Sequence, residues 1–156
     1  QGVVAALSLG AQAVSLGTRF LCSAEAAATR AYKERVVRST AEDTVYTMLF
    51  DLGWPDAPHR VLRNAAFAEW EAAGRPASGQ LPGEGRIVGT VSLAGITLEV
   101  PRYGAVIPIT SFSGNMESVA LLAGESCSLV HDIKPAAQSV QDLRREAETV
   151  IAHMQR

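Results

Sequence analysis

Short apolar segments and glycine turns alternate over the first residues of the chain. The first apolar side chains recur at helical spacing and predict a short amphipathic helix: they are Val3, Val4, Leu7 and Ala11. This helix is predicted to end near Gly10, and the apolar run Ala13–Leu16 then predicts a short buried strand that stops at Gly17-Thr18. Because a helix, a turn and a short buried strand repeat in parallel α/β folds, the pattern indicates that class.

A second helix is predicted over residues 23–38, where Ala24–Ala28 favours the helical state. The pattern then changes, since residues 44–50 are rich in β-branched and aromatic side chains and predict a strand. Residues 52–58 contain Gly and Pro and predict a turn, and His59–Leu62 predicts another short strand. A different subregion therefore begins after the second helix.

The next region combines a helix, a loop and a hairpin. Asn64 is a suitable N-cap for a helix over residues 65–73, and the Gly- and Pro-rich residues 74–89 predict a loop. Apolar and polar positions alternate over residues 87–100 on both sides of Ala94-Gly95, which predicts a β-hairpin.

Two further helices are predicted near the end of the chain. The first begins after Asn115, stops at Gly124 and has one apolar face, formed by Met116, Val119, Ala120 and Ala123. The second has a start that resembles a capping box, at Ser139 and Asp142. Its apolar stripe is continuous and requires a partner surface: Val140, Leu143, Ala147, Val150, Ile151 and Met154.

The composition is typical of globular protein and narrows the choice of partners. With 156 residues, 47% of them hydrophobic and 19% charged, the chain is long enough to bury one ordinary core. Its 14 basic and 16 acidic residues are dispersed and give a net charge of −2, so we expect no nucleic-acid partner. The most apolar region is interrupted by polar residues, so we also expect no membrane-spanning segment.

Cysteine usage and the start of the chain suggest a cellular context. Cys22 and Cys127 lie far apart and lack the spacing of a metal site or a disulfide framework, so they are interpreted as small buried side chains. We therefore expect a reducing, cytoplasmic location and no metal. The chain begins with Gln1 instead of Met, without a signal-peptide pattern, and is interpreted as part of a longer protein.

The most informative stretch for function is GAQAVSLGTRFL, residues 10–21. At a strand end, Gly17 permits close approach of backbone amides to an anion, and Thr18 adds a hydroxyl group. The N-terminus of a following helix contributes partial positive charge. Because TIM barrels often bind phosphate after their last strands, this turn is a candidate phosphate site. The alternative is a strand that ends at Gly only to let the chain turn.

Three stretches of the sequence carry a resemblance to a known family. AALSLGAQAVSLGTRFL, residues 5–21, resembles the end of the flavin barrel in nitronate monooxygenases, formerly called 2-nitropropane dioxygenases. DAPHRVLRN, residues 56–64, and GNMESVALLAGESCSLVHDIKPAAQSV, residues 114–140, are similar in order and spacing to the C-terminal half of that family. The resemblance thus extends along the whole chain.

The resemblance implies an α/β fold, the C-terminal part of a flavin-binding TIM (β/α)8 barrel with a small α+β insert. On this interpretation residues 1–40 are the end of the barrel with its eighth strand, residues 41–110 are the insert, and residues 111–156 return to the outer helices. A complete TIM barrel takes about 250 residues. We therefore expect this chain alone to be inactive.

The resemblance also implies the cofactor FMN and its contacts. Gly17 and Thr18 match the turn whose backbone contacts the FMN phosphate, and Leu16 lies beside it. Ser15 stands where the family more often has Gln. The catalytic His of the monooxygenases corresponds to a part of the barrel that precedes Gln1, so no catalytic residue is assigned in this chain.

The reaction implied is the oxidation of alkyl nitronates by O2. Close relatives are NAD(P)H:quinone reductases or enoyl-reductases of fatty-acid synthesis, so a small-molecule substrate, O2 or a quinone, and NAD(P)H are the candidate partners, and a homo-oligomer is a further expectation. Two alternatives stay open: a non-catalytic module that lacks most of the active site, and another phosphate-binding barrel such as a nucleotide-converting enzyme.

Several other polar residues have competing interpretations. Tyr103 and Ser111 are candidates to line the substrate cavity, and the alternative is a connector whose Tyr packs against the insert. Arg19 either faces solvent or adds a supporting charge for the phosphate. The three histidines, His59, His131 and His153, are interpreted as structural or surface residues.

Overall fold

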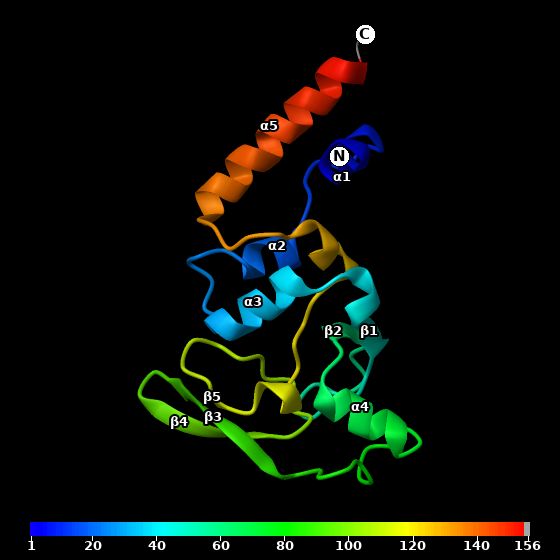
Figure 1. The fold of residues 1–156 in the computed structure, drawn as a ribbon, viewed down its shortest axis with the longest axis vertical. Coiled ribbons are helices and arrows are strands. Elements are labelled where there is room, and N and C mark those ends of the chain that lie inside the picture. The colour runs from blue at the N-terminus through cyan, green and yellow to red at the C-terminus, as the bar shows by residue number, and fades with distance from the viewer. Residues whose placement is uncertain (155–156) are drawn as a thin grey trace.

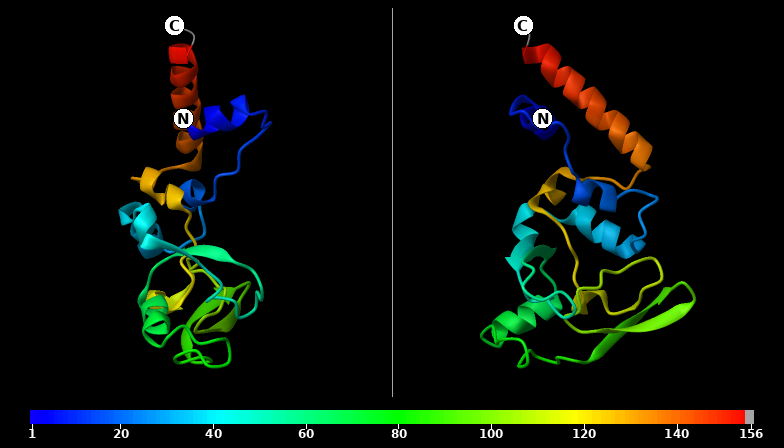
Figure 2. Two further views of the ribbon diagram at one scale, coloured as in Figure 1. Left: turned by 90° about the vertical axis from the view of Figure 1, so that its right-hand side faces the viewer. Right: turned by 180° about the vertical axis from the view of Figure 1, so that it is seen from behind.

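The structure is a computed structural model and describes residues 1–154. These residues form a mixed α/β fold whose body contains two small sheets, one with the order β1-β2 and one with the order β4-β3-β5. A long C-terminal helix, α5 (Ala136–Met154), projects from this body, and the first helix, α1 (Gly2–Ser8), lies beside it (Figure 1, Figure 2).

The first helix ends as the glycine pattern predicts. Gly10 has a φ of 95°, which a glycine adopts without steric cost. Its N–H donates to the Leu7 carbonyl, and the N–H of Ala11 donates to the Ala6 carbonyl. This pair of hydrogen bonds is a Schellman motif, and it satisfies carbonyl groups that the helix end would leave unpaired.

The predicted strand Ala13–Leu16 is wrong. Leu16 has extended dihedral angles, φ −127° and ψ 95°, but within residues 1–154 this stretch pairs with no strand. A strand is defined by hydrogen bonds to a neighbour, and an apolar pattern supplies only the tendency to extend. A short helix, α2 (Gly17–Leu21), follows directly.

The predicted helix over residues 23–38 forms only in its second half, as α3 (Arg30–Arg38). Ser23 instead forms a parallel bridge with Lys134, and the N–H of Ala24 donates to the Lys134 carbonyl. Thr29 then caps α3, because its side chain accepts the N–H of Tyr32. These tertiary contacts outweigh the helical preference of the alanine run.

The region after α3 matches its sequence pattern closely. A 3-10 turn, η1 (Ala41–Asp43), leads into β1 (Thr44–Thr47), which pairs antiparallel with β2 (His59–Leu62). Helix α4 (Ala65–Ala72) follows, and the Asn64 side chain accepts the N–H of Phe67 as predicted for its N-cap. Residue type alone thus predicts both the two strands and the helix.

The predicted hairpin is confirmed. Strands β3 (Ile87–Leu93) and β4 (Ile96–Pro101) pair antiparallel around Ala94 and Gly95, which have φ values of 50° and 80°. A short strand, β5 (Ser113–Gly114), adds to the other side of β3. Gly114 permits this approach because a Cβ there would collide with the Gly89 backbone.

The predicted helix after Asn115 is wrong beyond its first turn. Asn115 does cap a 3-10 turn, η2 (Met116–Ser118), but residues 119–123 then run extended beside β2. The N–H of Leu62 donates to the Leu121 carbonyl, and the N–H of Ala123 donates to the Arg60 carbonyl. A second 3-10 helix, η3 (Glu125–Leu129), follows.

The final helix forms but begins earlier than its capping-box pattern predicts. The first helical residue is Ala136, and Ser139 lies inside the helix and is buried. The Glu25 carboxylate accepts the N–H of Ala136 at 3.0 Å, so an acidic side chain distant in sequence serves the helix start.

The buried core consists of two clusters. The larger cluster packs α3 against the hairpin and the extended residues 119–123, and it contains Cys22, Ala28, Tyr32, Val36, Leu62, Val91, Val100, Val119, Leu121, Ala123, Cys127 and Val130. The smaller cluster lies around α4, and it contains Leu49, Phe50, Val61, Ala66, Phe67, Leu81, Tyr103 and Ala120. Core residues thus come from all three predicted segments, 1–40, 41–110 and 111–156, and those boundaries stay a prediction.

Candidate cofactor-binding site

The turn at Leu16, Gly17 and Thr18 is open on the side of Gly17. Gly17 is exposed, and a Cβ added to it would meet no atom within 4 Å. The first N–H groups of a helix have no carbonyl partner within the helix, and Leu16 in the N-cap position provides no side-chain acceptor. This turn therefore offers backbone donors beside free space.

Thr18 is held by a segment distant in sequence. Its side chain is buried, and its Oγ1 accepts the N–H of Gly124 at 3.0 Å. Gly124 precedes η3, so this bond joins the start of α2 to the start of η3. The sequence pattern indicates only a helix end at Gly124, because no local pattern reveals a hydrogen-bond partner 106 residues away.

Arg19 is half-buried and binds other parts of the chain. Its Nη1 donates to Asp132 Oδ1 at 2.8 Å, and its Nη2 donates to the carbonyls of Asp132 and Cys22. Burial opposes ionisation of Asp132, but hydrogen bonds from Lys134 and Arg19 outweigh it and lower the pKa of that carboxyl. Arg19 thus anchors α2 to the chain before α5, and a role toward phosphate stays a prediction.

The chain before α5 is joined to the helix by further ion pairs. Lys134 Nζ lies 2.7 Å from Asp142 Oδ2 and 3.1 Å from Asp132 Oδ2. Hydrogen bonds to Asp142 and Asp132 raise the pKa of Lys134. Together with the Arg19 contacts, these pairs fix the position of α2 relative to the base of α5.

The two candidates for a substrate cavity lie in the connector. Tyr103 is buried, packs against Phe50 and donates its hydroxyl hydrogen to the Pro82 carbonyl at 2.9 Å. Ser111 is exposed, and its Oγ donates to the Ser92 carbonyl at 2.7 Å, on the edge of the hairpin. Both side chains thus bind backbone carbonyls of the chain itself, and their role toward substrate stays a prediction.

The histidines lie in three separate places. His59 is buried, its ring stacks on Trp54, and its Nδ1 lies 2.7 Å from the Ala57 carbonyl. His131 and His153 are exposed, the first in the loop before α5 and the second near the end of α5. The described residues thus bring no two histidines together in one site.

Both cysteines are buried free thiols in the larger core cluster. Burial raises the pKa of both Cys22 and Cys127. A thiol with a raised pKa carries little thiolate near neutral pH, so neither side chain is prepared as a nucleophile.

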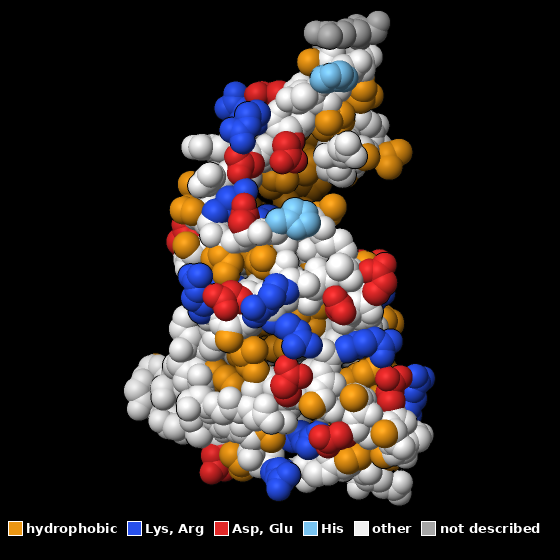
Figure 3. Space-filling model, viewed as in Figure 1, with side chains coloured by type: hydrophobic (Ala, Val, Ile, Leu, Met, Phe, Trp, Pro, Cys, Tyr) orange, Lys and Arg blue, Asp and Glu red, His pale blue; other side chains and the backbone are white. Residues whose placement is uncertain are grey.

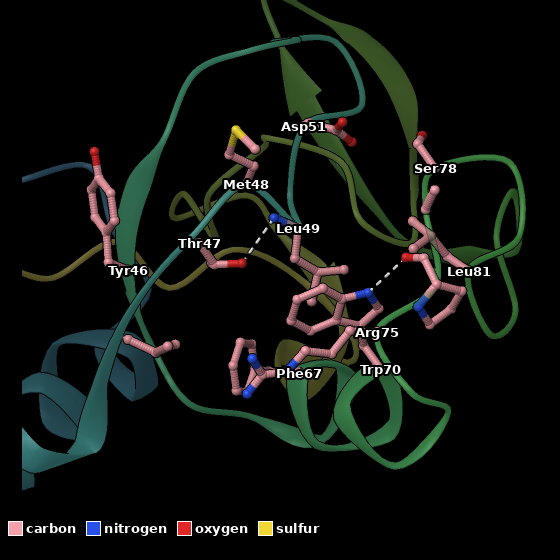
Figure 4. Close-up of a pocket in the computed structure, with 13 residues that line it drawn as sticks. Tyr46, Thr47, Met48, Leu49, Asp51, Phe67, Trp70, Arg75, Ser78 and Leu81 are labelled. Atoms are coloured by element: carbon pink, nitrogen blue, oxygen red, sulfur yellow. Dashed lines mark hydrogen bonds between the residues drawn. The ribbon is translucent and has the colours of Figure 1, made fainter.

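A pocket of about 380 Å³ lies between β1, α4 and the loop after α4 (Figure 4). Phe67 and Trp70 form part of its wall, and Asp51 and Arg75 contribute charge. Arg75 is already engaged, because it pairs with Glu71 and lies over the Trp70 ring. Residues 16–18, Tyr103 and Ser111 do not line this pocket.

A second hollow, of about 480 Å³, lies between α1 and α5 and is lined mainly by Val4, Leu7, Ile151 and Met154. Figure 3 shows apolar side chains along the side of α5 toward α1. Val140, Ile151 and Met154 of the predicted stripe are all exposed. Within residues 1–154, the chain thus covers the stripe only in part.

The described residues offer neither a cluster of metal ligands nor a helix suited to a membrane. Among residues 1–154, no group of three or more His, Cys, Asp or Glu side chains lies in a position to hold a metal ion. Over the same range, no helix combines the length and the apolar character that crossing a membrane requires.

Comparison with known proteins identifies the family. The family model described as nitronate monooxygenase matches residues 1–146, nearly the whole chain. The chain belongs to the nitronate monooxygenase family. The resemblance seen in residues 5–21, 56–64 and 114–140 is thereby confirmed.

Among curated relatives, the nitronate monooxygenase npaC of Metarhizium robertsii is 41% identical over 80 residues, which are 46% of this chain and 22% of the relative. A hydroxy-methyl-oxo-octahydroindene-carboxyl-CoA dehydrogenase of Mycobacterium tuberculosis is 36% identical over 75 residues, which are 48% of this chain and 20% of the relative. The matched part is thus about a fifth of each of these proteins.

The solved structures that are similar cover nearly the whole chain. FabK from Thermotoga maritima is 28% identical with a TM-score of 0.66, and the match covers 99% of this chain and 42% of that one. A mutant of the same protein is 24% identical with a TM-score of 0.60, over 99% of this chain and 39% of that one, and shows a likeness of fold. The chain spans less than half the length of these proteins.

Proposed function

We propose that this chain is part of an FMN-dependent oxidoreductase that oxidises alkyl nitronates with O2. The observation that carries the proposal is the family match over residues 1–146, which includes the turn at Gly17 and Thr18. The name of the Metarhizium relative supports the choice of a nitronate as substrate.

The geometry of the turn fits the phosphate group of FMN. The open space at Gly17 lets an anion approach the backbone, and the N–H groups at the start of α2 have no partner within the helix. We propose that the backbone of Gly17 and Thr18 binds the phosphate, with Leu16 beside it. A side chain at residue 17 would project into the same space and restrict this approach.

FMN, when bound, supplies the redox chemistry of the reaction, and the protein supplies binding and orientation. Residues 16–18 hold one end of the cofactor, and the ion pairs of Arg19, Asp132 and Lys134 fix that turn against α5. We assign no catalytic base to this chain. His59 is buried and stacks on Trp54, and His131 and His153 are exposed side chains that no contact joins to residues 16–18 within the described part of the chain.

Flavin retention tests the cofactor. The 156-residue chain and the longest reading frame that contains it are purified, loaded with FMN and desalted. We expect the longer protein to stay yellow and to consume O2 when an alkyl nitronate is added, and the chain alone to be inactive. A longer protein that stays colourless after reconstitution would contradict the proposal.

A second candidate is the oxidation or reduction of an acyl thioester. The name of the Mycobacterium relative favours this candidate, because it specifies a carboxyl-CoA dehydrogenase. NAD(P)H-dependent reduction of a quinone or an enoyl substrate belongs to the same class of flavin chemistry. In the same assay, flavin reduction by NAD(P)H without nitronate-dependent O2 uptake would favour this candidate.

A further inference from the structure

The β3–β4 hairpin has one closed edge and one open edge. The outer side of β3 is covered, because β5 pairs with part of it and Ser111 Oγ binds the N–H and the carbonyl of Ser92 at 3.1 and 2.7 Å. Strand β4 stands at the end of the order β4-β3-β5, and within residues 1–154 no strand pairs with its outer side. The hairpin projects from the body of the molecule, and residues 96–99 are all exposed (Figure 1, Figure 2). An open edge of this kind is a template for a further strand.

The turn of the hairpin determines which backbone groups of β4 face outward. In a hairpin closed by a two-residue turn, the residues beside the turn direct their N–H and C=O groups at one another, and this direction alternates along the strand. Leu93 and Ile96 are the partners beside the turn. Thr97 and Glu99 occupy the alternate positions and therefore direct their backbone groups away from β3. Ser92, the partner of Thr97, agrees with this alternation, because its N–H binds a side chain on the far side of β3.

The side chains of β4 form an apolar face and a polar face. Ile96 and Leu98 are 62% and 49% exposed, on the same face that buries Val100 further along the strand. Thr97 and Glu99 lie on the opposite face. Outward backbone groups beside exposed apolar side chains are the features by which a sheet edge binds another strand.

We propose that β4 pairs antiparallel with β4 of a second copy of this protein, about a two-fold axis at Leu98. In this register Thr97 of each copy lies opposite Glu99 of the other, so the outward N–H and C=O groups of both residues all find partners. The Thr97 hydroxyl lies beside a carboxylate of the second copy that accepts its hydrogen, and the two Leu98 side chains meet at the axis. This surface does not include the turn at residues 16–18, so the inference does not depend on the proposed function.

Other antiparallel registers satisfy fewer groups. An axis at Glu99 places two carboxylates opposite each other and Thr97 opposite Pro101, which has no N–H. An axis at Thr97 leaves Glu99 opposite Gly95, which belongs to the turn. The strand is thus complementary to itself about one position, and self-complementarity is what a two-fold interface requires.

Cysteine cross-linking tests the register in the longest reading frame that contains the chain. Opposite residues that share no hydrogen bonds have Cα atoms about 4.5 Å apart, a separation that a disulfide spans. We expect Leu98→Cys to form a covalent dimer on mild oxidation, seen on a non-reducing gel. Leu93→Cys is the matched control and should stay monomeric, because Leu93 is exposed on the same face but stands on β3, away from the axis. The native Cys22 and Cys127 are both buried. Cross-linking of both variants, or of neither, would overturn the inference.

Sedimentation equilibrium measures the association itself, and circular dichroism reports the fold of each variant. Thr97→Pro removes an outward N–H, which is the position that a proline occupies in edge strands, while Thr97→Ala loses the same hydroxyl and keeps the N–H. Because a dimer loses this donor twice, we expect Thr97→Pro to dimerise about 10-fold more weakly than Thr97→Ala. A monomeric parent protein, or equal dissociation constants for the two variants, would contradict the pairing of β4. The cross-linking pattern decides the question independently of how Thr97→Pro folds.

Discussion

At the scale of single residues, the structure depends on side chains that satisfy two backbone groups at once. Asn64 is an example, because its Oδ1 accepts the N–H of Phe67 and its Nδ2 donates to the Val119 carbonyl at 2.9 Å. The residue is buried, so water does not replace either bond when the side chain is removed. Asn64 thus joins α4 to the extended segment beside β2.

Asn64→Ala should lower the free energy of unfolding by about 2 kcal/mol, because a cap and a buried hydrogen bond are lost together. Urea denaturation checks this value. Asn115→Ala is the matched control, since Asn115 is exposed and caps only η2, and it should cost about 0.5 kcal/mol. Equal costs for the two variants would show that the bond to Val119 contributes nothing.

At the scale of elements, the helices and strands fall into two groups. Those determined locally, such as β2, α4 and the β3–β4 hairpin, form where residue type and turn chemistry predict them. The patterns of residues 24–28 and 119–123 predict helix, but neither stretch is helical: Ala24 donates to the Lys134 carbonyl, and residues 121–123 exchange backbone hydrogen bonds with β2. Contacts between distant segments are invisible to a local pattern, and the same limit concealed the Thr18–Gly124 bond.

The start of α5 should depend on pH through Glu25. The hydrogen bond from the Ala136 N–H lowers the pKa of this carboxyl. Because the folded-state pKa is depressed, the stabilisation is present above the ordinary carboxyl range and is lost as pH falls below about 4. The amide resonance of Ala136 in NMR spectra should therefore shift in that range.

Glu25→Gln keeps the size of the side chain and removes its titration. In that variant the Ala136 resonance should stay constant below pH 4, apart from the smaller effect of Asp142, whose pKa is lowered chiefly by the hydrogen bond from Lys134. An unchanged titration in the variant would mean that another group controls the helix start.

At the scale of the whole molecule, the larger core cluster contains three groups that resist deprotonation. Burial raises the pKa of Tyr32, Cys22 and Cys127 above their ordinary values. Tyr32 also donates its hydroxyl hydrogen to the Leu122 carbonyl, which connects α3 to the segment beside β2. Ionisation of any of these groups favours the unfolded chain.

The protein should consequently lose stability in alkaline solution. A group whose pKa is higher in the folded state contributes its full stability below its unfolded-state pKa and loses it as the pH rises above that value. The free energy of unfolding should therefore begin to fall near pH 8.5 because of the thiols and near pH 10 because of the phenol. Urea midpoints measured between pH 7 and pH 10.5 check this. The Cys22→Ser/Cys127→Ser variant should lose the first part of the decline and keep the second.

Arg60 of β2 contacts the chain on both sides of Gly124, because its carbonyl accepts the N–H of Ala123 and its guanidinium pairs with Glu125. Because the N–H of Gly124 donates to Thr18, a ligand bound at the proposed phosphate turn would stabilise the contact between α2 and this segment, and its binding would be thermodynamically coupled to folding of the small β1-β2 sheet.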